Sequence, residues 1–64
     1  MRDVNWEEPF CGEGNNCFRL GTDEDDNAYI AVAGAEDTCI TDSREALRTL
    51  IREIKAGKAD HLLQ

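Results

Sequence analysis

The segment that decides the fold runs from Asp42 to Gly57 and reads DSREALRTLIREIKAG. Its larger apolar side chains recur at intervals of three and four residues, which places them on one face of an α-helix; they are Leu47, Leu50, Ile51 and Ile54. Asp42 with Glu45 three residues later matches a capping box and predicts the start of the helix. Gly57 predicts its end, because glycine readily adopts the left-handed conformation that closes many helices. The sequence therefore predicts an amphipathic helix over 42–57, and its apolar side must be covered by something.

Three short segments before the helix have the alternation of β-strands: Cys17–Leu20, Ala28–Ala33 and Thr38–Thr41. The loops between them are short enough to favour antiparallel hairpins. We therefore expect an α+β fold, with a three-stranded antiparallel meander over 16–41 and the helix packed on one face. The predicted core is Phe18, Leu20, Ile30, Val32, Ile40, Leu47, Leu50, Ile51 and Ile54.

The length of 64 residues predicts one small domain over 1–64. Such a chain buries only about 60 % of the surface that it exposes when unfolded, so a partner surface is physically motivated. Residues 1–9 form an arm in which Trp6, together with Phe10, either attaches to the core or anchors a partner. In the tail, 58–64, Leu62 and Leu63 either fold back over the core or form a patch that faces a partner.

The net charge of −7 is divided unevenly along the chain. Residues 1–42 contain eleven acids and two bases, a net −9, whereas residues 43–64 contain three acids and five bases, a net +2. The acidic part repels phosphate backbones, so we expect no direct nucleic-acid binding and instead a basic protein partner. The sequence shows no run long enough for a membrane span and no signal peptide, so we expect no membrane association and a cytoplasmic location.

The three cysteines, Cys11, Cys17 and Cys39, are an odd number and do not suggest a disulfide framework. We expect them to be small buried apolar residues in a reducing cytoplasm. The alternative is a zinc-stabilised structural module in which His61 supplies a fourth ligand, but the spacing lacks the usual pair of cysteines two residues apart.

The loop between the first two predicted strands resembles the opening of a calcium loop, with Asp23, Asp25 and Asn27 at alternate positions. Ala28 stands where such a loop needs glycine, so we interpret the loop as a solvated acidic hairpin loop. His61 is the only histidine, and the sequence contains no glycine-rich phosphate-binding motif. We therefore expect no enzymatic activity, no cofactor, no metal and no small-molecule substrate.

A basic strip borders the apolar stripe of the predicted helix and consists of Arg44, Arg48, Arg52 and Lys55. Three roles are open for it. The arginines can cross the edge of the core and pair with the acidic strands, they can form the rim of a docking surface, or they can contact phosphate. With Leu62 and Leu63, the arginines are the candidate partner-binding residues.

The order of these features resembles a small actinobacterial family known as domain of unknown function 397. The resemblance rests on Trp6, on Cys11-Gly12 and Gly14, on Asn16-Cys17-Phe18, on Tyr29-Ile30-Ala31-Val32, and on the helix end Ile54-Lys55-Ala56-Gly57. It covers nearly the whole chain and implies structural roles for Trp6, Gly12, Gly14, Asn16, Cys17 and Gly57. Two departures stand out: Ala33-Gly34-Ala35 replaces a charged Arg-Asp-Ser, and Leu47 and Leu50 replace helix aromatics.

The resemblance implies a small acidic factor encoded beside a helix-turn-helix transcription regulator, which it binds and modulates, in some cases as an antitoxin-like protein. Other proteins of this kind are similar to self-associating developmental regulators. We therefore expect a non-enzymatic interaction module for such a regulator, and the alternative is a homodimer that pairs its apolar stripe or sheet edge across a two-fold axis.

Overall fold

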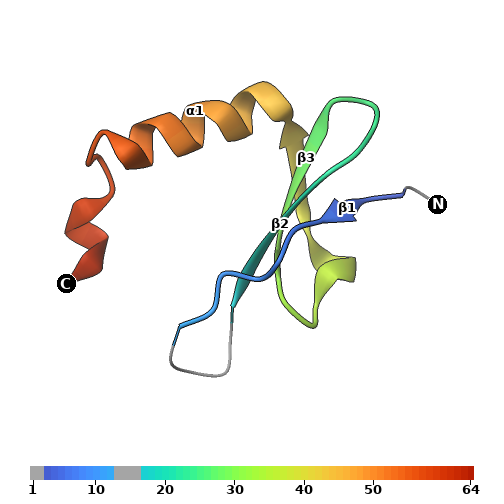
Figure 1. Ribbon diagram of the computed structural model, residues 1–64, viewed down its shortest axis with the longest axis horizontal. Coiled ribbons are helices and arrows are strands. Elements are labelled where there is room, and N and C mark those ends of the chain that lie inside the picture. The colour runs from blue at the N-terminus through green and yellow to red at the C-terminus, as the bar shows by residue number, and fades with distance from the viewer. Residues whose placement is uncertain (1–2, 13–16) are drawn as a thin grey trace.

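The computed structural model describes residues 3–12 and 17–64. Over these residues, the fold is α+β, as predicted: an antiparallel sheet with strand order β1-β2-β3-β4 is followed by one α-helix (Figure 1). The strands are β1 (Asn5–Trp6), β2 (Phe18–Thr22), β3 (Asn27–Val32) and β4 (Ile40–Ser43), and the helix is α1 (Arg44–Lys55). Two short 3-10 helices, η1 (Glu36–Thr38) and η2 (Asp60–Leu63), complete the chain.

The sheet has four strands, whereas the sequence predicted three. The additional strand is β1, which lies in the segment predicted to be an arm and pairs through Asn5 with Thr22 and through Trp6 with Gly21. Two residues are too few to show a strand alternation in the sequence. A Cβ placed on Gly21 would lie 2.7 Å from Val4 Cγ1 and 2.8 Å from Trp6 Cε3, so the glycine is what allows the arm to lie close against β2.

The buried apolar residues of the described chain all lie in β3, and the predicted core contains none of them. Tyr29 and Ala31, 3 % and 6 % exposed, lie on one face of the sheet, and Ala28, 5 % exposed, lies on the other. The Trp6 ring packs beside Tyr29 with its centroid 6.2 Å away. Arg19 reinforces this side, because its Nε donates to the carbonyl oxygen of Glu7 and its Nη1 pairs with Glu36 Oε2 at 3.0 Å.

The predicted core was wrong for most of its members. Six of the nine residues are 39–67 % exposed: Phe18, Val32, Ile40, Leu50, Ile51 and Ile54. The other three, Leu20, Ile30 and Leu47, are half-buried. The periodicity identified which side chains share a face, but the sheet and the helix do not close over that face.

The reason lies at the junction between β4 and α1. Ser43 is the last residue of β4 and also the N-cap of the helix, and its Oγ accepts a hydrogen bond from the Ala46 amide at 3.1 Å. The predicted capping residue, Asp42, stays in the strand, pairs with Ala28, and accepts a bond from the Ser43 amide instead. No loop residue separates the strand from the helix, whereas connections in compact domains usually span about 4–6 residues, and α1 leaves the end of β4 without turning back over the sheet (Figure 1).

The helix therefore packs on β3 and β4 near its start and then projects beyond the sheet (Figure 1). It ends at Lys55, and Gly57 has a φ of 90°, as its predicted role at the helix end requires. The radius of gyration is 12.6 Å, whereas a compact 64-residue domain would have about 11 Å. The chain thus forms an arch rather than a closed body.

Candidate protein-interaction groove

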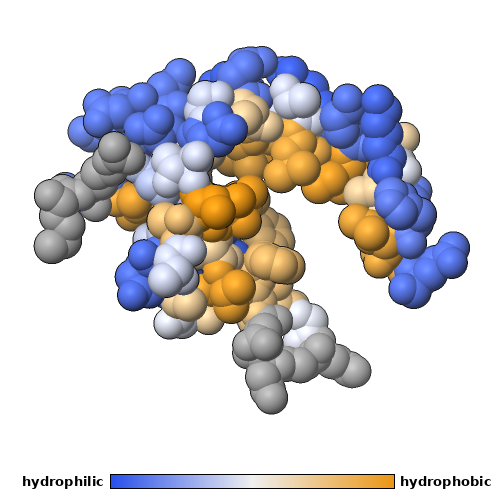
Figure 2. All heavy atoms as spheres, turned by 180° about the vertical axis from the view of Figure 1, so that it is seen from behind, coloured by the Kyte–Doolittle hydropathy of each residue, from blue (hydrophilic) through white to orange (hydrophobic). Residues whose placement is uncertain are grey.

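An apolar groove lies under the arch, between the sheet and the helix. Its volume is about 520 Å³, and its lining is Phe10, Phe18, Leu20, Ile30, Leu47, Leu50, Ile51, Ile54 and Lys55. Figure 2 shows the hydrophobic surface on the sheet and on the underside of the helix, facing an open hollow. We call this feature the apolar groove.

Strand register brings the sheet wall of the groove together. Directly opposed residues of antiparallel strands point to the same face, and the register pairs Phe10 with Phe18, Phe18 with Val32, and Leu20 with Ile30. Ile40 of β4 continues the row opposite Ile30. The sheet wall is thus a continuous row of large apolar side chains.

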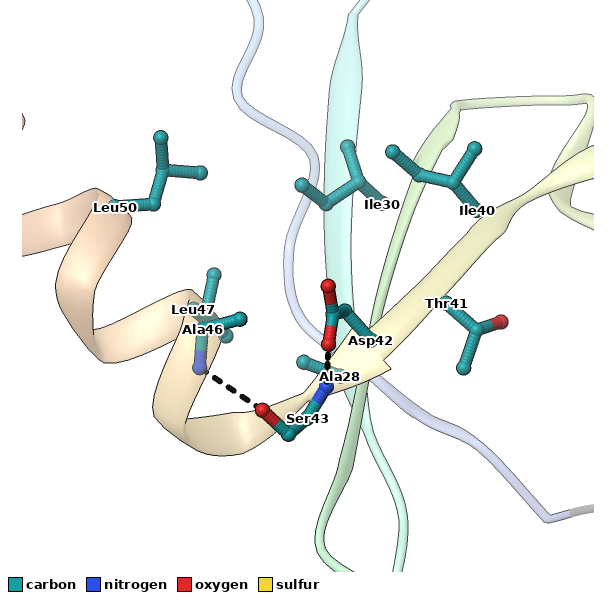
Figure 3. A pocket seen from close by; sticks show the side chains of 9 residues that line it. All are labelled: Ala28, Ile30, Ile40, Thr41, Asp42, Ser43, Ala46, Leu47 and Leu50. Atoms are coloured by element: carbon teal, nitrogen blue, oxygen red, sulfur yellow. Dashed lines mark hydrogen bonds between the residues drawn. The ribbon is translucent and has the colours of Figure 1, made fainter.

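The inner end of the groove is where the helix meets the sheet. A smaller cavity of about 220 Å³ lies here, and Figure 3 shows Ile30 and Ile40 from the strands and Leu47 and Leu50 from the helix around it. The Ser43 cap holds the first turn of α1 against this cavity. This end is the one place where the helix stripe contacts the sheet as the sequence predicted.

A disulfide lies at the outer end of the groove. Cys11 and Cys17 are bonded, with a Cα–Cα distance of 4.7 Å, so the prediction that they are buried free thiols was wrong. Beside the disulfide, the Phe10 amide donates to the Phe18 carbonyl oxygen at 2.8 Å. The pair of phenylalanines is thus held by both a backbone bridge and a covalent link. Cys39 is free and half-buried.

The exposed apolar surface is large for a chain of this size. Nine large apolar residues of the described chain are exposed: Phe10, Phe18, Val32, Ile40, Leu50, Ile51, Ile54, Leu62 and Leu63. Their exposed fractions sum to on the order of 900 Å², and the seven on the sheet and helix, without Leu62 and Leu63, account for about 700 Å². The largest apolar patch of a typical monomer measures about 300–600 Å². Leu62 and Leu63 are 74 % and 85 % exposed, so the tail does not fold back over the core.

The arginines of the predicted basic strip do not act as a single surface. Arg44 is held by the β2–β3 hairpin, because its Nη2 donates to the carbonyl oxygen of Asp23 at 2.6 Å and its Nε lies 3.6 Å from Asp26 Oδ1. Arg48 and Arg52 instead pair with Glu45 of their own helix. Arg44 thus has a structural role, while Arg48 and Arg52 are exposed beside the groove.

The acidic loop, which was predicted to be solvated, contains a buried carboxylate. Asp23 is 6 % exposed and accepts hydrogen bonds from the amides of Asp25 and Asn27, from Asn27 Nδ2, and from the Tyr29 hydroxyl at 2.6 Å. The Tyr29 bond, more than any other contact, lowers the pKa of Asp23 to about 2. Asp23 therefore organises the hairpin. The pattern that resembled a calcium loop is better explained as this network of turn hydrogen bonds.

The described lining of the groove is almost entirely apolar. Small-molecule sites combine an apolar lining with a few polar groups that converge on the ligand, and among the described lining residues Lys55 is the one that carries a charge. Among residues 3–12 and 17–64, no three ligand-type side chains gather as a metal site would require. The zinc alternative loses two of its sulfur ligands to the Cys11–Cys17 disulfide.

The motif residues of the resemblance are partly described. Trp6 and Gly57 have the structural roles reported above, whereas Gly12 is exposed. Cys17 carries the disulfide, and Gly14 and Asn16 lie outside the described residues.

No helix in the described part of the chain has the length and apolarity that crossing a membrane requires. Comparison of the chain with protein-family models, with curated proteins and with solved structures found no match.

Proposed function

We propose that this protein is a non-enzymatic interaction module that binds and modulates a helix-turn-helix transcription regulator. The observation that carries the interaction role is the apolar groove, whose lining includes five of the nine exposed large apolar residues of the described chain. Exposed apolar surface of this extent is typical of protein–protein contacts.

The charge of the chain supports a basic partner. The exposed side chains at the tip of the β2–β3 hairpin include Glu24, Asp25 and Asp26, within a segment, 1–42, of net charge −9. A DNA-binding regulator presents a basic surface, so opposite charges would speed its association with this chain. The resemblance described above leads to the same class of partner.

Co-purification tests this proposal. The chain is produced together with a helix-turn-helix regulator of the kind that the resemblance implies, and one of the two proteins carries a tag. We expect the untagged protein to co-elute at low salt, and we expect the complex to weaken as salt increases, because screening acts on exposed charges.

Matched variants locate the contact. Asp25→Lys reverses one charge at the hairpin tip, and Asp60→Lys makes the same change in η2, at the C-terminal end of the arch. We expect Asp25→Lys to weaken co-elution and Asp60→Lys to leave it unchanged. If the regulator never co-elutes at any salt concentration, the proposed function is wrong.

A further inference from the structure

We propose that a second copy of this chain occupies the apolar groove, with α1 of each copy lying on the open sheet wall of the other around a two-fold axis. This inference rests on the proposed function: the second copy occupies the apolar groove, and the regulator contacts the acidic tip of the β2–β3 hairpin on the outside of the dimer. The occupant is identified by three properties of the chain: the incomplete closure of its fold, the area of its apolar face, and the distribution of its charges.

The first property is the incomplete closure of the fold: the sheet and the helix each expose an apolar face, and the two faces would form a core if they met. The sheet wall presents Phe10 and Phe18, each 64 % exposed, and the helix wall presents Ile51 and Ile54, 44 % and 49 % exposed. The two walls separate because α1 starts directly at the end of β4. A second copy supplies a helix for the first copy's sheet and a sheet for its helix, so one contact covers both walls in both copies.

The second property is area. A two-fold contact uses the same surface on both copies, so an exposed sheet and helix face of about 700 Å² per copy would bury at most about 1,400 Å² in total, within the range of stable specific interfaces.

The third property is charge. Two chains of net charge −7 repel each other, but the described lining of the groove contains Lys55 and no acid. The helix and tail, 43–64, carry a net +2 and the sheet segment, 1–42, a net −9. Placing each helix on the partner's sheet therefore brings together segments of opposite net charge, with no acid of the described lining inside the apolar contact.

Sedimentation equilibrium of the purified chain, alone and over a wide range of concentration, tests the proposal. We expect a reversible change from the monomer mass of 7.2 kDa to twice that mass. Ile51→Asp places a charge in the groove, and Thr49→Asp places the same charge about 200° around the helix, on its exposed outer side. We expect Ile51→Asp to raise the dissociation constant at least about a hundredfold, since symmetry removes the contact twice, and Thr49→Asp to change it less than about threefold.

An isotope-filtered NOE experiment on mixed labelled and unlabelled chains then identifies the contact. We expect intermolecular signals between the Ile54 methyl groups of one copy and the Phe18 ring of the other. Circular dichroism confirms that each variant is folded. A folded chain that is monomeric at every concentration overturns the proposal, as does a dimer that the two aspartate variants weaken equally or not at all.

The regulator experiment separates this inference from the proposed function. If the chain is monomeric and Ile51→Asp abolishes co-elution with the regulator, the regulator occupies the groove; the second-copy proposal is then wrong and the proposed function stands. If the dimer forms and the regulator never co-elutes, the second-copy proposal stands and the regulator is not the partner.

Discussion

Gly21→Ala should destabilise the protein, although strand propensity alone predicts the opposite. Replacing glycine by alanine inside a strand usually stabilises by about 0.5–1 kcal/mol. At this position, however, the new methyl group would lie 2.7 Å from Val4 Cγ1 and 2.8 Å from Trp6 Cε3, so the arm must move away from β2. Overpacking of this kind costs about 1–3 kcal/mol.

The steric effect should therefore dominate, leaving a net loss of about 1–2 kcal/mol in the free energy of unfolding. For a chain of this length, such a loss lowers the melting temperature by roughly 5–15 °C. Urea unfolding followed by tryptophan fluorescence is the assay, because Trp6 is the single tryptophan and its emission should shift to the red as the arm leaves the sheet.

Gly12→Ala is the matched control. No described atom lies within 4 Å of a Cβ at Gly12, so its effect should stay within about 0.5 kcal/mol. If Gly21→Ala unfolds at the same or a higher urea concentration than the parent, the arm does not pack on β2 as described.

Three further changes test the hairpin, the disulfide and the helix start. Tyr29→Phe removes the hydroxyl that does most to lower the pKa of Asp23 to about 2. The stability from this lowered pKa is present above about pH 4 and is lost toward pH 2, so the variant should unfold at a higher pH than the parent when the solution is acidified. An unchanged midpoint pH of acid unfolding would contradict this. Reduction of the Cys11–Cys17 disulfide should lower the free energy of unfolding by about 2 kcal/mol, measured by urea titration with and without reductant, because it releases a short closed loop. Ser43→Ala should lower the thermal stability by about 1 kcal/mol through loss of the helix cap, whereas an unchanged melting temperature would mean that the cap lies elsewhere.

The sequence predicted the elements that depend on local patterns. The helix stripe, the positive φ of Gly57 and the two longer central strands all follow from spacing or from the conformational freedom of glycine. Of the two roles left open for Trp6, packing against the body of the protein is the one that the structure shows, whereas Phe10 is exposed. The sequence could not show β1, because this two-residue strand pairs with β2 only where Gly21 has no side chain, and its own composition carries no strand signal.

Burial was the poorest prediction, for a related physical reason. Hydrophobic periodicity reports which side chains share a face, but what covers that face depends on how the elements are connected. Here one residue, Ser43, ends the strand and begins the helix, so Ile51 and Ile54 remain exposed despite their regular spacing. The small buried residues Ala28 and Ala31 carry little sequence signal. Asp23 resembled any other loop acid, although the tyrosine six residues later is its hydrogen-bond partner.

We infer that one copy of the chain exposes its apolar face and that another protein covers this face. Solvent paramagnetic relaxation of the isoleucine methyl groups, measured from dilute to concentrated protein, tests this most directly. In dilute solution, we expect strong relaxation at Ile40, Ile51 and Ile54, which are 67 %, 44 % and 49 % exposed. These methyl groups should become protected as concentration rises. Methyl groups that are protected at the lowest concentration, where the chain sediments as a monomer, would contradict the account, because the chain would then cover its own groove.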